Sequence, residues 1–333
     1  ALSGSINVTF NKGSSDAIDV DIENISFNTS GIVLDPMRPY VYIANGDSLS
    51  TYHVVSGTLI NTTASPLAGV DLTNLVIHPD GSMLLASNSE TYLDEDEVEQ
   101  TRVNHYQFDL TDYQFSQINS DDITIEFRPL MIKMIAGAAV VITQTLEYAD
   151  LNLVRQYWDQ ENAFFASTAA QANSTNMYMV YNQSATSLER FTLAYNAYAS
   201  EMVSVTNEPA YSNVAFTNLS NFAISHDGNT IYTANSVSEW ASFNGSTYAD
   251  NALLQGNANV QTFNTSTDTD DNSYFYRFDP TLGITYSKYN NAQVELWSEV
   301  ISNATAQSYL MPAYQRVLIY DASTTTLRLR SHQ

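Results

Sequence analysis

A strand–turn–strand unit that recurs along the chain is the feature that most restricts the fold. Its clearest copy is residues 77–88, IHPDGSMLLASN. An apolar residue leads into a Pro-Asp-Gly turn, where Gly81 can take a positive φ and the Asp80 carboxylate can accept backbone amides. The unit returns as residues 224–235, ISHDGNTIYTAN, and, with a longer turn, as residues 33–45, VLDPMRPYVYIAN. Such repetition indicates a repeat architecture rather than a single hairpin.

Each unit continues into a second strand that alternates aromatic or aliphatic residues with polar ones. Six such strands occur, at residues 49–54, 103–109, 153–157, 188–193, 274–279 and 326–329. Many short strands at a period of about 40–50 residues predict an all-β protein of repeated antiparallel sheets. We expect a β-propeller with six blades of mainly four strands, because stacked sheets of this kind cover one another's apolar faces.

The interval between the fourth and fifth units is longer than the others. We assign it to an insertion at residues 236–272, and a seventh blade hidden there is the alternative. The last unit ends soon after Leu329, without an outermost strand. We expect residues 5–10 to supply that strand and close the ring. The chain then divides into N-terminal strands at 1–30, for ring closure or strand exchange with a neighbour, and a propeller at 31–333.

The turn units at 77–88 and 224–235 resemble the YVTN repeats of surface-layer propellers. Those repeats have a Pro-Asp-Gly turn, an apolar strand and a Val-Ala-Asn ending. The resemblance extends to the wider group of lactonase-like propellers and is clear in three units, although the first turn and the loop after residue 235 are longer than in the family pattern. It implies a propeller and an extracellular setting. It implies no reaction, because propellers host many functions.

The charge of the chain restricts its partners. Its 333 residues carry 36 acidic and 12 basic side chains, a formal net charge of −24. Such a surface repels phosphate backbones and anionic lipids, so we expect no nucleic-acid partner. No run approaches the ~18 apolar residues of a membrane span. There is no cysteine, which excludes disulfides and thiol chemistry. Because no leader precedes Ala1, we expect an extracellular or cell-surface protein whose signal peptide has been removed.

Motifs for catalysis are scarce in the sequence. There is no Gly-x-Ser-x-Gly elbow and no His-Glu-x-x-His zinc motif. His78 lies in a repeated turn, and His53 and His105 lie in equivalent second strands, so we interpret them as framework residues. Asn45 and Asn88 end equivalent strands, where they either cap the backbone or share a ligand.

Two acidic runs are candidates for calcium, because carboxylates at alternate positions can surround the ion. The residues are Asp94, Asp96 and Glu97 in the first run and Asp268, Asp270 and Asp271 in the second. Neither run has the full EF-hand pattern, and a solvated acidic loop is the alternative for both.

Glycosylation motifs and clustered aromatic residues point to the surface. Trp240, Phe243 and Tyr248 lie in the expected insertion and are candidates for contact with a protein or a sugar. Asn-x-Ser/Thr sequons, which are typical of a secreted glycoprotein, begin at Asn7, Asn24, Asn28, Asn61, Asn173, Asn182, Asn218, Asn244, Asn264 and Asn303.

The sequence favours a non-catalytic, secreted or cell-surface structural and interaction protein. We expect it to be an acidic glycoprotein that self-assembles into a filament or layer through its N-terminal strands. Its partners would be other copies, other surface proteins or glycans, and calcium is the only cofactor considered. One alternative is a metal-dependent propeller enzyme of the lactonase or lyase kind. Another is a carbohydrate-binding module that uses Trp240.

Overall fold

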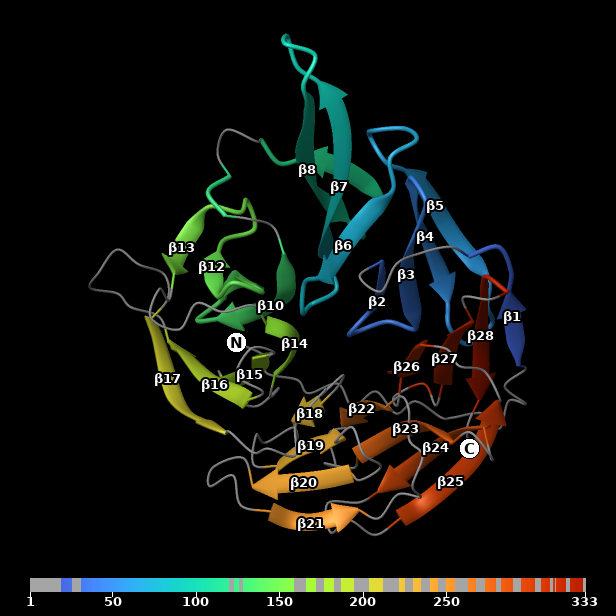
Figure 1. Ribbon diagram of the computed structural model, residues 1–333. Coiled ribbons are helices and arrows are strands. Elements are labelled where there is room, and N and C mark those ends of the chain that lie inside the picture. Colours follow the sequence, from blue (N-terminus) through green and yellow to red (C-terminus); the bar gives the residue numbers. More distant parts are fainter. Residues whose placement is uncertain are drawn as a thin grey trace, which may run out of the picture.

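The structure is a computed structural model built almost entirely of β-strands (Figure 1). In the part of the chain that it describes, no helix is long and apolar enough to cross a membrane. The described residues are 19–25, 31–119, 123–125, 128–158, 166–171, 177–182, 187–194, 204–211, 222–224, 230–234, 240–244, 250–254, 263–267, 273–279, 283–289, 295–302, 307–311, 314, 316–321 and 324–331. The strands are β1 (Val20–Ile22), β2 (Ile32–Leu34), β3 (Tyr40–Asn45), β4 (Ser48–His53), β5 (Leu59–Ala64), β6 (Leu72–Ile77), β7 (Met83–Leu93), β8 (Glu99–Asp109), β9 (Gln114–Gln117), β10 (Pro129–Ile135), β11 (Ala138–Thr143), β12 (Glu147–Ala149), β13 (Arg155–Trp158), β14 (Ala166–Gln171), β15 (Met177–Asn182), β16 (Ser187–Ala194), β17 (Ser204–Tyr211), β18 (Phe222–Ile224), β19 (Thr230–Ala234), β20 (Trp240–Asn244), β21 (Asp250–Leu254), β22 (Phe263–Thr267), β23 (Ser273–Asp279), β24 (Gly283–Tyr289), β25 (Glu295–Ser302), β26 (Gln307–Met311), β27 (Arg316–Asp321) and β28 (Thr326–Ser331).

The described strands pair into seven four-stranded antiparallel sheets. Six are built from consecutive strands: sheet I (β2–β5), sheet II (β6–β9), sheet III (β10–β13), sheet IV (β14–β17), sheet V (β18–β21) and sheet VI (β22–β25). Sheet VII has the strand order β1-β28-β27-β26. The prediction of an all-β protein with four-stranded antiparallel sheets is confirmed.

The expected count of six units is wrong, because residues 236–272 contain regular strands. β20 and β21 complete sheet V, and β22 is the first strand of sheet VI. The sequences of β21 and β22 are DNALL and FNTST. β22 is mostly polar and β21 has only a short apolar end, so neither strand carries the long apolar run or the aromatic alternation by which the other units are recognised.

The N-terminal part of the chain supplies one edge of sheet VII. β1 pairs antiparallel with β28, with Val20 opposite Leu329 and Ile22 opposite Leu327. Apolar and acidic residues alternate over residues 18–22, a pattern that predicts a strand, and residues 20–22 form β1. It occupies the edge that we assigned to residues 5–10, which lie outside the described residues.

The second strands of sheets I, II and III are apolar on both faces. In β3, Val41 and Ile43 pack into a core shared with sheet VII, whereas Tyr42 and Ala44 pack into a core shared with sheet II. Alternate residues of β7 likewise enter the I–II core and the II–III core, and those of β11 enter the II–III and III–IV cores. This double burial explains why these strands are continuous apolar runs instead of alternating ones.

Neighbouring sheets follow one another in chain order. The first strands lie side by side as β2 with β6, β6 with β10, β10 with β14, β14 with β18, β18 with β22, and β22 with β26. Sheet VII then packs against sheet I through the core that contains Leu318, Leu329, Val41 and Ile43. Figure 1 shows the same succession, from the blue strands of sheet I to the red strands of sheet VII beside them.

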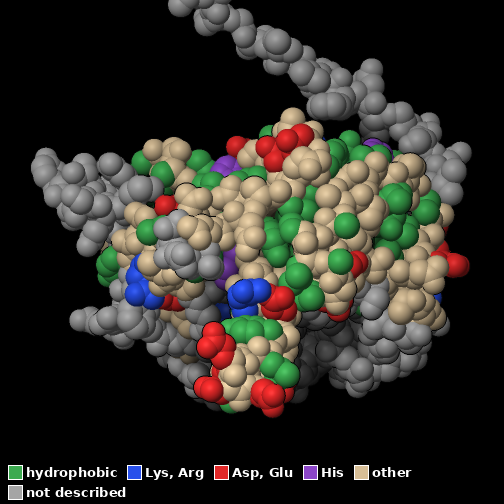
Figure 2. All heavy atoms as spheres, turned by 90° about the horizontal axis from the view of Figure 1, so that it is seen from above, with side chains coloured by type: hydrophobic (Ala, Val, Ile, Leu, Met, Phe, Trp, Pro, Cys, Tyr) green, Lys and Arg blue, Asp and Glu red, His purple; other side chains and the backbone are tan. Residues whose placement is uncertain are grey.

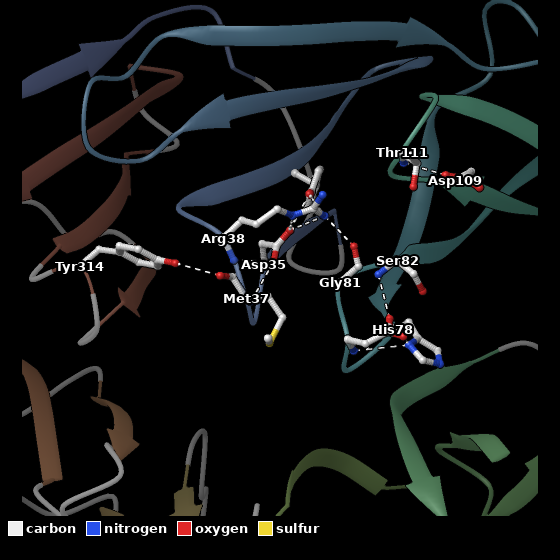
Figure 3. A network of polar contacts seen from close by, with 11 residues as sticks. Asp35, Met37, Arg38, His78, Gly81, Ser82, Asp109, Thr111 and Tyr314 are labelled. Carbon is white, nitrogen blue, oxygen red and sulfur yellow. Dashed lines mark hydrogen bonds and ion pairs between the residues drawn. The ribbon is translucent and has the colours of Figure 1, made fainter. Parts of the chain in front are cut away.

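A hydrogen bond between two turns connects sheet I to sheet II (Figure 3). Gly81, in the Pro-Asp-Gly turn, has a φ of 71°, as the sequence predicted. Its carbonyl accepts a hydrogen bond of 2.6 Å from Arg38 Nη2, which lies in the equivalent turn of sheet I. A Cβ at residue 81 would lie 3.0 Å from Asp35 Oδ1, so only glycine fits both the dihedral and the contact. On the other side, Tyr314 donates to the Met37 carbonyl at 3.2 Å.

A buried carboxylate organises the turn of sheet I. Asp35 is 3% exposed, and its Oδ1 accepts the backbone amides of Met37 and Arg38, both at 2.8 Å. Its Oδ2 accepts Arg38 Nε and the Tyr42 hydroxyl, both at 2.7 Å. Burial alone would lower the pKa of Arg38, but the hydrogen bond and charge of Asp35 outweigh it, and the pKa is raised. The cluster is therefore an ion pair with most of its hydrogen bonds satisfied.

Replacing Arg38 with Met should destabilise the fold by about 3 kcal/mol, because the Asp35 carboxylate stays buried without its counter-charge. Adding Asp35→Asn should recover part of the loss. The matched control is Arg102→Met, which removes an exposed ion pair with Glu90 and should cost less than ~1 kcal/mol. Urea unfolding monitored by circular dichroism measures all three. Equal losses for the two single variants would show that the turn cluster does not hold the sheets together.

Candidate interaction sites

The first candidate site is the seam where β1 meets sheet VII. Three residue pairs join β1 to β28. Asp21 Oδ1 lies 2.7 Å from Arg330 Nη1, and the same Nη1 donates to the Val20 carbonyl at 3.3 Å. Asp19 lies 3.9 Å from Arg330 Nε, so two carboxylates of the N-terminal segment face one guanidinium. The attraction between these carboxylates and Arg330 therefore favours the pairing of β1, near the start of the chain, with β28, near its end.

Ile25 anchors the same segment just beyond β1. Its side chain is buried in the core between sheets VII and I. Its amide donates to the Thr325 carbonyl at 2.8 Å, and its carbonyl accepts the Tyr320 hydroxyl at 3.1 Å. Gly57 of sheet I faces Val20, and a Cβ at residue 57 would lie 2.4 Å from that side chain. The N-terminal segment therefore packs closely against two sheets, VII and I.

The second candidate site is a ribbon formed by residues 89–103. β7 and β8 are far longer than their neighbours, and they stay paired from Ser89–Val103 out to Leu93–Glu99. The described pairs of β6 and β9 end at Asn88 and Tyr106, so the ribbon extends beyond both flanking strands. Figure 1 shows it projecting from the body of the molecule. Figure 2 looks down on this end, where acidic and apolar side chains lie together.

One face of the ribbon, termed the ion-pair face, is held together by its own side chains. Arg102 Nε donates to Glu90 at 2.6 Å, and the guanidinium lies 5.5 Å from the ring centroid of Tyr92. Gln100 donates to Asp94 Oδ2 at 2.9 Å. The hydrogen bond from Arg102 lowers the pKa of Glu90. This face satisfies its polar groups internally.

The other face, termed the threonine face, has no such contacts. It consists of Ser89, Thr91, Leu93, Glu99, Thr101 and Val103. All six are exposed, Leu93 at 67% and Val103 at 43%. Within the described residues, their side chains form no hydrogen bond, ion pair or ring contact. The ribbon therefore carries one closed face and one open face.

The acidic run at the ribbon tip forms a turn. Asp94 Oδ1 accepts the amides of Asp96 and Val98 at 3.0 and 2.9 Å, and these bonds lower its pKa, that from Val98 most. Glu97 takes a positive φ of 59°. No group of three His, Asp or Glu residues in the described part of the chain is placed to hold a metal ion. The Asp94 carboxylate thus serves the turn, and calcium binding by this run stays a prediction without support from the geometry.

Two of the equivalent strand-end asparagines, Asn45 and Asn88, bond to neighbouring parts of the chain, and the third, Asn235, lies outside the described residues. Asn88 is fully buried, donates to Ser65 Oγ at 3.3 Å, and accepts the Tyr106 hydroxyl at 3.4 Å. Because Ser65 belongs to the neighbouring sheet's connection, this is a contact between sheets. Asn45 instead donates to the Asn24 carbonyl at 3.4 Å.

The sequons differ in accessibility. Asn24 is exposed, and Asn61 is half-buried on the edge strand β5, with its amide 2.7 Å from Thr63 Oγ1. Asn182 is only 7% exposed, because it pairs inside sheet IV. A glycan at Asn182 would have to displace packed neighbours. Asn244 and Asn264 lie in β20 and β22. Asn7, Asn28, Asn173, Asn218 and Asn303 lie outside the described residues.

Other predicted site residues fall in sheet V or outside the described residues. Trp240 and Phe243 are in β20, a regular strand of that sheet rather than an insertion. Tyr248, Asp268, Asp270 and Asp271 lie outside the described residues.

Sequence reasoning missed a polar cavity and a buried lysine. The cavity, of about 660 Å³, lies between sheets II and III and is lined by Gln107, Ser116, Gln117, Ile118, Asn119, Asn152 and Val154. No spacing in the sequence brings these residues together. Lys133 is buried in β10, and burial lowers its pKa to about 8. The burial of Lys133 could have been recognised from the sequence, because it is the one charged residue of the otherwise apolar strand PLMIKMI.

Comparison of the chain with protein-family models gives no match, and comparison with curated proteins gives none either.

The buried His105 predicts a pH dependence. Burial lowers its pKa from 6.5 to about 4, so the folded state favours the neutral ring. Its contribution to stability is complete above about pH 6.5 and is lost as the pH falls toward 4, because the unfolded chain binds the proton more readily. His105→Gln should flatten the stability profile in this window by up to about 1.4 kcal/mol per pH unit. His53→Gln, at a partly exposed site, is the control. Identical slopes for the wild type and His105→Gln would contradict the assignment.

Proposed function

We propose that the chain is a non-catalytic secreted or cell-surface protein, a seven-bladed β-propeller that assembles through its N-terminal strand. Each sheet would be a blade, and β1 would complete the last one. The supporting observations are the contacts of each sheet with its neighbours in chain order, and the packing of sheet VII on sheet I. A ring would explain why β3, β7 and β11 are covered on both faces, since only closure removes the two ends of a stack.

The observation that carries assembly is the seam. β1 is held by three residue pairs, one close ion pair and the Ile25 anchor. The same contacts form whether the strand comes from the same chain or from a second copy, so exchange between copies has a low free-energy cost. Repeated exchange in one direction produces a filament or a layer. The turn units at 77–88 and 224–235 and their resemblance to surface-layer propeller repeats favour the extracellular setting.

The acidic surface sets the conditions for assembly. Copies that each carry a formal charge of −24 repel one another at low ionic strength. Salt shortens the screening length to ~3 Å at 1 M. Assembly should therefore increase with salt, and sedimentation at rising NaCl concentration measures it.

A complementation experiment tests strand exchange. Asp21→Lys and Arg330→Asp each place like charges across the seam, and each should weaken assembly by about 1 kcal/mol. In an equimolar mixture, opposite charges meet only when β1 of one variant pairs with β28 of the other. The mixture should then assemble better than either variant alone, as measured by light scattering. The double variant, with the charges reversed within one chain, is the control for folding.

Failure of the mixture to exceed the two single variants, while the double variant behaves like the wild type, would show that β1 closes only its own chain. Assembly by strand exchange would then be rejected, and the propeller itself would be unaffected.

Glycosylation gives a separate test of the extracellular setting. In protein isolated from its natural source, mass spectrometry of glycopeptides should find glycans at Asn24 and Asn61 and none at the buried Asn182. Unmodified peptides at both Asn24 and Asn61 would contradict the proposed glycoprotein.

A further inference from the structure

The threonine face of the ribbon and the polar cavity lie on the same side of β8, with the buried His105 between them. Side chains on a strand alternate between faces, so Thr101, Val103 and Gln107 point to the same side of β8. Gln107 lines the cavity, where its Nε2 donates to the Leu151 carbonyl at 2.9 Å and lies 3.2 Å from Asn152 Oδ1. The exposed face and the cavity between sheets II and III therefore share one side of β8 and are separated by a single buried position.

The open face needs cover for a physical reason. A two-stranded ribbon is at best marginally stable in water when neither face is packed. The ion-pair face has its own contacts, but the threonine face exposes Leu93 and Val103. Both edges of residues 89–103 also lack a strand partner in the described part of the chain. Exposed β-branched side chains beside an unpaired edge are the features to which an extended peptide adds as a further strand.

The chemistry of the cavity fits a peptide backbone. Amide and hydroxyl side chains dominate its lining, and no charged side chain contributes to it. Amides both donate and accept hydrogen bonds, as peptide groups require.

Charge selects the kind of peptide. Between residues 89 and 103, Glu90, Asp94, Glu95, Asp96, Glu97 and Glu99 are opposed only by Arg102, which is already paired with Glu90. A second copy of the chain is a poor occupant, because its 12 basic residues are outnumbered by 36 acidic ones. A basic partner gains both attraction and orientation from the acidic tip.

We propose that the threonine face and the cavity below it form a docking site for an extended, basic segment of a different protein, which adds as a strand along the ribbon. This site is separate from the seam at β1. Attachment to a partner and assembly of copies would therefore use different surfaces of the molecule.

The probe is a capped peptide of alternating Lys and Val, whose binding to the full chain is followed by fluorescence anisotropy. A Lys-Pro peptide of equal charge is the first control, because proline has no N–H to donate to a strand edge. A Glu-Val peptide is the second. The Lys-Val peptide should bind, and each control should bind at least about tenfold more weakly.

Variants locate the site. Leu93→Ser with Val103→Ser, and Gln107→Ala separately, should each weaken binding of the Lys-Val peptide several-fold. Leu59→Ser with Ile60→Ser, an equally exposed apolar pair on β5, should leave it unchanged. Replacing residues 89–103 by an Asn-Gly turn between the paired Asn88 and Asn104 should abolish binding while leaving the melting temperature close to that of the wild type.

Several outcomes would overturn the proposal. No binding of the Lys-Val peptide, or equal binding of the Lys-Pro peptide, would leave only a charged surface. Unchanged binding in the Leu93/Val103 variant would place the peptide elsewhere. A loss of self-association in that variant, measured by sedimentation, would make a second copy the occupant of the face.

Discussion

Burial of both faces of the middle strands, seen in β3, β7 and β11, is the constraint on which the rest of the structure depends. A strand such as β3 sends Val41 and Ile43 to one core and Tyr42 and Ala44 to another. At about 25 cal/mol per Å² of apolar surface, a sheet that lost a neighbour would forfeit several kcal/mol. Each sheet therefore requires a sheet before it and a sheet after it. The chain meets this requirement at its ends by bringing β1 and Ile25 onto sheet VII, beside sheet I.

The repeated turns hold this stack in register. The turn of sheet I uses Arg38 to reach the Gly81 carbonyl of sheet II and accepts Tyr314 from the side of sheet VII. The Pro-Asp-Gly turn is thus a contact point between sheets as well as a reversal of the chain. This role explains why His78 and Asp80 belong to the framework: they bond to each other, and Asp80 also accepts the Ser82 amide. Specific binding is better sought where the units differ.

Much of the fold could be predicted from the sequence, because a strand that is buried on both faces appears in the sequence as a continuous apolar run. The runs VYIA, MLLA and VVIT mark middle strands, and the turn residues mark where they begin. The edge strands were harder to predict, since β21 and β22 are short and neither has a long apolar or alternating pattern. For this reason residues 236–272, which contain strands of sheets V and VI, were interpreted as an insertion. At the candidate sites, the alternation in Asp19–Ile22 indicated a pairing strand, and the acidic run indicated a special loop. The cavity and the threonine face could not be predicted, because they depend on how β8 aligns with the connection between β12 and β13.

The ribbon at residues 89–103 departs from the constraint that governs the other strands. It extends two strands into solvent with one face uncovered, and the surrounding carboxylates restrict what can cover it. In our proposals, the seam joins copies of the chain and the ribbon holds a partner. Both proposals require that the stack of sheets keeps the two sites in place. Electron cryo-microscopy of the native protein tests that stack most directly. We predict seven sheets around one axis, with a strand of residues 20–22 along the free edge of β28, from the same copy or from its neighbour. A map with six sheets, or with that edge of β28 empty, would contradict the account.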